Sequence, residues 1–150
     1  STMRMNYTMM GDTVNIAARL EASAKQYGIY IQVNESTYNS TKDKFEWRFL
    51  DYVKVKGKQL PVKVYELIGE KEKIKDTDKV AVDAFTHAQE LYFNQDWDKA
   101  IKAFTDANEL EDMFPGRTEN PSNIYLQRCY QLKENPPGKD WDGVWVLTKK

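Results

Sequence analysis

The sequence predicts an α+β fold in residues 1–69, followed by a small all-α module in residues 80–150. Residues 1–69 combine short strand patterns with one helical pattern. Beyond residue 80 the apolar residues recur at helical spacing. Between these parts, residues 70–79 are rich in charge and typical of a solvated linker. Two small domains joined by this linker are therefore expected.

The first part is expected to open with an extended segment, residues 1–10, that runs into Gly11. A helix follows from about Thr13 to Gln26, because Asp12 and Thr13 supply cap oxygens and apolar residues then recur at helical spacing. Gly28 is a plausible end for it.

Three strands are expected after this helix, in residues 29–33, 45–55 and 61–68. A brief helix or turn at residues 34–36 follows the first. In the second strand, aromatic residues alternate with Glu46, Arg48 and Leu50. The last two strands should form an antiparallel hairpin around Lys56-Gly57-Lys58.

The second part is expected to hold three helices and an extended tail. The first two are broken by Asn94-Gln95-Asp96, and the third starts at Pro121 and runs to about Lys133. The tail, residues 141–147, should pack through its tryptophans. The order of small and aromatic residues in the first two helices resembles one tetratricopeptide unit: Ala88, Tyr92, Trp97, Ala100, Phe104, Ala107 and Leu110.

Composition excludes several classes of function. A formal net charge of -1 argues against a general nucleic-acid partner, which needs a basic surface. The sequence has no run of about 18 apolar residues, so no membrane contact by this chain is expected. The single Cys129 cannot form an intramolecular disulfide, which favours a reducing, cytoplasmic location. The parent protein could still be attached to a membrane.

Asn15 and Arg19 are four residues apart and share one face of the predicted helix. Taken by themselves, they are compatible with two ordinary solvated residues. The run Tyr7-Thr8-Met9-Met10-Gly11-Asp12-Thr13-Val14-Asn15-Ile16-Ala17-Ala18-Arg19-Leu20-Glu21, however, closely resembles the signature segment of class III nucleotidyl cyclases. The similarity extends through Gly28-Ile29-Tyr30-Ile31 and the predicted hairpin, and so covers residues 1–69.

The resemblance implies a partial ferredoxin-like cyclase half-domain and a reaction that closes ATP into 3′,5′-cyclic AMP with release of pyrophosphate. Arg19 matches the arginine that stabilises the transition state, and Asn15 matches the asparagine that positions the ribose. Thr8 occupies the purine-recognition position and favours ATP over GTP. Lys56 matches a lysine that contacts the triphosphate, although Lys58 could take its place.

The family also implies a head-to-tail homodimer and two Mg²⁺ or Mn²⁺ ions. The two metal-binding aspartates and the lysine that reads adenine belong to the first half of the family's domain. That half is not found in this sequence, so the isolated fragment is expected to be inactive and no metal ligand is assigned here.

Other residues favour ordinary roles. Asp12 is expected to cap a helix, His87 lacks clustered ligands, and Cys129 lacks a partner base and is expected to be a buried small residue. Trp141 and Trp145 are expected to be packing anchors. The alternatives to an adenylate cyclase are a guanylate cyclase and a non-catalytic interaction module, in which the helices dimerise or bind a protein partner.

Overall fold

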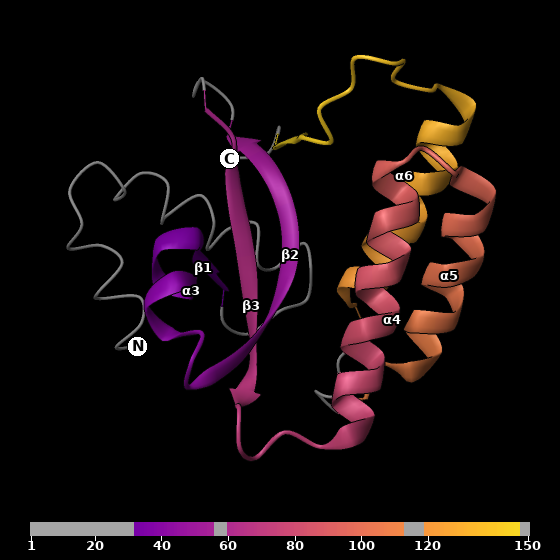
Figure 1. Ribbon diagram of the computed structural model, residues 1–150. Helices are drawn as coiled ribbons and strands as arrows, with labels where there is room; N and C mark the ends of the chain where they lie inside the picture. The colour runs from indigo at the N-terminus through magenta and orange to yellow at the C-terminus, as the bar shows by residue number, and fades with distance from the viewer. Residues whose placement is uncertain (1–31, 56–59, 113–118, 148–150) are drawn as a thin grey trace. The chain divides into compact units, whose positions relative to one another are not determined.

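The structure is a computed structural model that describes residues 32–55, 60–112 and 119–147 of the chain. These residues form a mixed α+β fold with four helices and a four-stranded sheet (Figure 1). The chain divides into two compact units. One unit takes residues 1–72 together with 144–150, and the other takes residues 73–143. The helical unit is therefore inserted in the sequence between two strands of the same sheet.

The sheet of the first unit has the strand order β1-β3-β2-β4. Its strands are β1 (Gln32–Asn34), β2 (Phe45–Val55), β3 (Val62–Glu70) and β4 (Trp145–Leu147). The alternating pattern correctly predicted the long hairpin, because β2 and β3 pair antiparallel. β1 also pairs antiparallel with β3, whereas β4 pairs parallel with β2. The described part of the sequence-predicted tail thus contributes a strand to the sheet.

Helix α3 (Glu35–Thr41) packs beside this sheet. It begins where Asn34 accepts a hydrogen bond from the Thr37 amide at 3.0 Å, which satisfies one of the free N–H groups of the first turn. Tyr38 of α3 stacks on Tyr65 of β3, with ring centroids 4.0 Å apart. The small core between them contains the buried Val33, Trp47 and Tyr65.

The helical unit contains α4 (Asp76–Phe93), α5 (Trp97–Leu110) and α6 (Pro121–Glu134). All three helices were predicted, but α4 starts inside the charged segment 70–79. Asp76 and Asp78 lie in its first turn, where carboxylates interact favourably with the positive end of the helix dipole. The break at residues 94–96 is confirmed: the Gln95 and Asp96 amides donate to carbonyls at the end of α4, and Gln95 has a φ of 60°.

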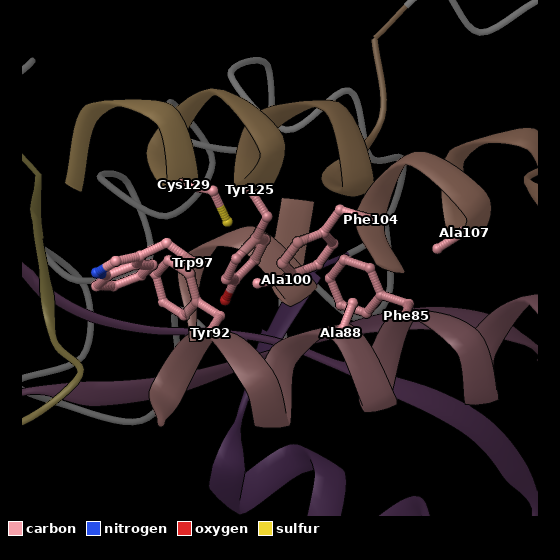
Figure 2. Close-up of a cluster of buried hydrophobic side chains, with 9 residues drawn as sticks. All are labelled: Phe85, Ala88, Tyr92, Trp97, Ala100, Phe104, Ala107, Tyr125 and Cys129. Atoms are coloured by element: carbon pink, nitrogen blue, oxygen red, sulfur yellow. The ribbon is translucent and has the colours of Figure 1, made fainter. Parts of the chain in front are cut away.

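Aromatic rings from all three helices fill the core of this unit (Figure 2). Tyr125 of α6 lies between the other helices, and its ring centroid is 4.9 Å from that of Tyr92 and 5.0 Å from that of Phe104. Small residues, including Ala88 and Ala100, let the backbones approach one another. Trp141 packs on Tyr92 and Trp97, so its expected role as a packing anchor is confirmed.

Candidate functional site

The β2–β3 hairpin is the described element that leads to a predicted site residue. The last pair of described residues in this hairpin is Val53 with Val62. Lys56 follows the end of β2 by one residue in the sequence. Residues 56–59 lie outside the described residues, so the predicted contact of Lys56 with the triphosphate stays a prediction from sequence.

The other predicted site residues also fall outside the described part of the chain. Thr8, Asn15 and Arg19 all belong to residues 1–31. Their assignment to the purine, the ribose and the transition state therefore stays a prediction from sequence. The same holds for the expected helix of residues 13–26 and for the cap at Asp12.

Two irregularities in the β2–β3 pairing determine which β2 side chains share a face. The register shifts between Glu46 and Trp47, and again between Phe49 and Asp51. Arg48 pairs with Glu66, and Asp51 pairs with Val64. Because Val64 and Glu66 are two residues apart on β3, they share a face, and the second shift brings Asp51 to the same face as Arg48.

This face holds a buried cluster of charged side chains, in which Arg48, Asp51 and Glu66 are all fully buried. The Arg48 Nε donates to Glu66 Oε1 at 3.0 Å, and Arg48 Nη2 forms an ion pair with the same oxygen. Asp51 accepts a hydrogen bond from the Tyr52 amide at 2.8 Å. Ionised groups are buried at an acceptable cost only when paired or hydrogen-bonded in this way. The cluster can fix the register of the two strands that carry the Lys56 turn.

Sequence reasoning did not single out this cluster. Charged residues that alternate with aromatic residues ordinarily indicate a strand with one solvent-exposed face. One feature of the sequence could have predicted the ion pair. Once the register of the hairpin is set, Arg48 and Glu66, which carry charges of opposite sign, are cross-strand neighbours. No sequence pattern predicts the register shift next to Asp51, so the burial of Asp51 could not be predicted in the same way.

A hollow of about 330 Å³ opens at the other end of the hairpin. It is lined by both signs of charge and by aromatic rings: Tyr38, Lys42, Asp43, Phe45, Glu46, Trp47 and Lys71. Lys71 Nζ donates to the Lys42 carbonyl at 3.0 Å, which holds one of the cations against the backbone. This mixture of charges does not select one class of ligand.

Cys129 is a buried residue, as expected from the sequence. Cys129 is buried in the helical core, and burial raises the pKa of its thiol to about 12. A thiol held in its protonated form is a poor nucleophile. His87 is exposed on α4. Among residues 32–55, 60–112 and 119–147, no group of three or more His, Cys, Asp or Glu residues could hold a metal ion.

In a comparison with known proteins, residues 1–69 match the family model of the adenylate and guanylate cyclase catalytic domain. This match supports the class III cyclase resemblance found in the signature run and the hairpin. No solved structure matches the chain. The helices within the described residues include none that is long and apolar enough to cross a membrane.

The chain is also similar to particular adenylate cyclases. It is 32% identical over 132 residues to "Adenylate cyclase, terminal-differentiation specific" of Dictyostelium discoideum, covering 85% of this chain and 6% of that protein. Adenylate cyclase 1 of Rhizobium meliloti is 39% identical over 66 residues, covering 44% of this chain and 10% of that protein. Adenylate cyclase of Anabaena cylindrica is 42% identical over 69 residues, covering 44% of this chain and 14% of that protein. The chain therefore spans a small part of each relative.

Proposed function

We propose that this chain is part of a class III adenylate cyclase that converts ATP into 3′,5′-cyclic AMP and pyrophosphate for intracellular signalling. The match of residues 1–69 to the cyclase catalytic domain carries this proposal. The names of the three relatives, all adenylate cyclases, favour ATP over GTP as the substrate. Thr8, at the purine-recognition position of the resemblance, favours the same choice.

In this proposal the chain contributes the groups that act on the ribose and the triphosphate. Negative charge builds on the phosphoryl oxygens as the ribose 3′-oxygen attacks the α-phosphorus. Arg19 supplies a positive charge for that transition state, and Asn15, four residues before it in the sequence, orients the ribose. Thr8 accepts a hydrogen bond from the adenine amino group, and Lys56 contacts the triphosphate.

In this proposal, the residues that bind divalent metal ions are not Thr8, Asn15, Arg19 or Lys56. The described residues lack a cluster of ligands suited to Mg²⁺ or Mn²⁺, so they do not fit a metal site. The family's metal-binding aspartates lie in the first half of its domain. We therefore propose that the 150-residue chain has no cyclase activity by itself and that a second subunit, arranged head to tail, completes the site.

The architecture proposed with this function has two parts. Residues 1–69 would form a partial ferredoxin-like half-domain, for which the antiparallel β2–β3 hairpin is the supporting observation. The helical region would form one tetratricopeptide-like unit with a third helix. Helices α4 and α5 follow one another and run antiparallel (Figure 1), and Ala88 and Ala100 are buried together with aromatic residues; both observations support that part.

The test is a cyclase assay on the longer protein that we propose contains this sequence, with ATP and GTP side by side in the presence of Mn²⁺. Cyclic AMP formation that EDTA abolishes is expected, with ATP the better substrate. The isolated chain, assayed in parallel, should give no product. A folded longer protein that forms no cyclic nucleotide would favour a non-catalytic interaction module, and a preference for GTP would indicate a guanylate cyclase.

A further inference from the structure

The short strand β4 covers one edge of β2. Three residue pairs make up this parallel β2–β4 ladder: Val53 with Trp145, Lys54 with Val146, and Val55 with Leu147. Among the described residues, the pairing of β2 with β3 ends at Val53, so Lys54 and Val55 pair with β4 alone. A ladder of three pairs at the edge of a sheet belongs to the part of a fold that opens locally at low cost.

The segment just before β4 is fixed to the core of the helical unit. The ring centroid of Trp141 lies 5.3 Å from that of Tyr92 and 5.7 Å from that of Trp97. Gly143 is so close to Phe93 that a Cβ at this position would lie 2.8 Å from the ring. All three aromatic partners lie at the end of α4 or the start of α5. We call these contacts of Trp141 and Gly143 the Trp141 anchor.

One residue, Val144, separates the Trp141 anchor from the first residue of β4 in the sequence. Two residues of extended chain span at most about 7 Å, so this link has little slack. Without the anchor, β4 would instead be joined to the end of α6 through residues 135–144. A longer and looser link lowers the effective concentration of a tethered segment at its binding site. The anchor therefore favours the pairing of β4 with β2.

We propose that β4 is a strap through which the helical unit controls the end of β2. An intact Trp141 anchor keeps β4 on Lys54 and Val55, and loss of the anchor releases it. Such coupling is reciprocal, so release of β4 also weakens the anchor. A ligand of the helical unit that displaced Trp141 would thereby uncover an edge of the sheet. This inference stands whether or not residues 1–69 act in a cyclase.

The first test is amide hydrogen exchange of the full chain, measured at residues 53–55. Trp141→Ala should raise the exchange rate of the amides that β4 protects by about tenfold or more. Phe85→Leu is the matched control, because it weakens the same helical core about two turns of α4 away from Phe93. This control should leave exchange at residues 53–55 as in the native chain. Unchanged exchange in Trp141→Ala, or an equal rise in both variants, would overturn the proposal.

A second variant loosens the link without removing any contact of the helical core. Insertion of Gly-Ser-Gly-Ser after Val144 leaves the Trp141 anchor and the sequence of β4 intact. The added slack should raise exchange at residues 53–55 by about threefold or more, while the exchange of α4 and α5 stays close to native. Native exchange at residues 53–55 in this variant would mean that β4 pairs independently of the anchor, and the proposal would be wrong.

A disulfide between β2 and β4 provides the third test. Lys54 and Val146 are paired, and neighbouring strands lie about 4.8 Å apart, within the range of Cα separations that a disulfide spans. The native Cys129 is buried, so the thiols of Lys54→Cys/Val146→Cys should pair with each other. In the oxidised form, adding Trp141→Ala should no longer raise exchange at residues 53–55, and reduction should restore the rise. A rise that persists after oxidation would show that the anchor does not act through β4.

Discussion

Arg48 and Glu66 place opposite charges in a fully buried site between two neighbouring strands. Such a pair need not add net stability, because desolvation offsets much of the attraction. Its clearer effect is on register: a slip of β2 by one residue would turn Arg48 to the other face of the sheet and leave Glu66 buried without it. The pair thus selects one arrangement of the hairpin that leads to Lys56.

Removing one partner of this pair should destabilise the protein strongly. Arg48→Met or Glu66→Leu alone should lower the free energy of unfolding by about 3–5 kcal/mol, because a charge then stays buried without its partner. The double variant Arg48→Met/Glu66→Leu should lose less than either single variant. Urea unfolding of the four proteins checks this cycle. If the loss of unfolding free energy in the double variant equals the sum of the two single losses, Arg48 and Glu66 do not stabilise each other and the interpretation is wrong.

Cys129 provides a second test at the scale of one residue. Because burial raises the pKa of its thiol to about 12, the native protein should react very slowly with Ellman's reagent at pH 8. The same protein unfolded in urea should react at once. An unfolded thiol ionises near pH 9, so its ionisation should begin to favour the unfolded state above that pH, and the stability that Cys129 contributes should fall as the pH rises from about 9 toward 12. Rapid reaction of the folded protein would mean that the thiol is accessible.

At the scale of elements, the connection from α6 to β4 contains two glycines with left-handed backbone. Gly138 has a φ of 95° and Gly143 a φ of 80°. A Cβ at Gly143 would lie 2.8 Å from the Phe93 ring, whereas a Cβ at Gly138 would meet nothing within 4 Å. The two positions therefore share backbone strain but differ in the space around them.

The matched variants Gly138→Ala and Gly143→Ala separate these two costs. Gly138→Ala should cost about 1 kcal/mol, the strain of a positive φ. Gly143→Ala should cost at least about 1 kcal/mol more, because overpacking against Phe93 adds to the same strain. Thermal unfolding of both variants measures the difference. Equal melting temperatures would show that Phe93 yields without cost.

The elements themselves followed largely from local patterns. Alternation predicted β2 and β3, and helical spacing with Asn94-Gln95-Asp96 and Pro121 predicted α4, α5 and α6. The burial of Arg48 and Asp51 could not be predicted in this way, because it depends on bulges and on strand pairing between residues far apart in sequence. The parallel pairing of β4 with β2 depends on a still longer connection. The predicted site residues lie outside the described residues, so their geometry remains a sequence prediction.

At the scale of the whole molecule, one strand of the sheet unit comes from the far end of the chain. β4 pairs with β2 after the entire helical unit has intervened in sequence. The sheet and the helices α4, α5 and α6 therefore belong to separate compact units in one chain.

The central claim is that Arg19 stabilises the transition state of a cyclase reaction, and the Arg19→Ala variant of the longer protein tests it most directly. We expect kcat for cyclic AMP formation to fall by about 10²–10³-fold or more, with an unchanged free energy of unfolding. Lys139→Ala, which removes an exposed cation from the helical unit, is the control and should retain native kcat. Native turnover in Arg19→Ala, or a loss that only tracks unfolding, would contradict the claim.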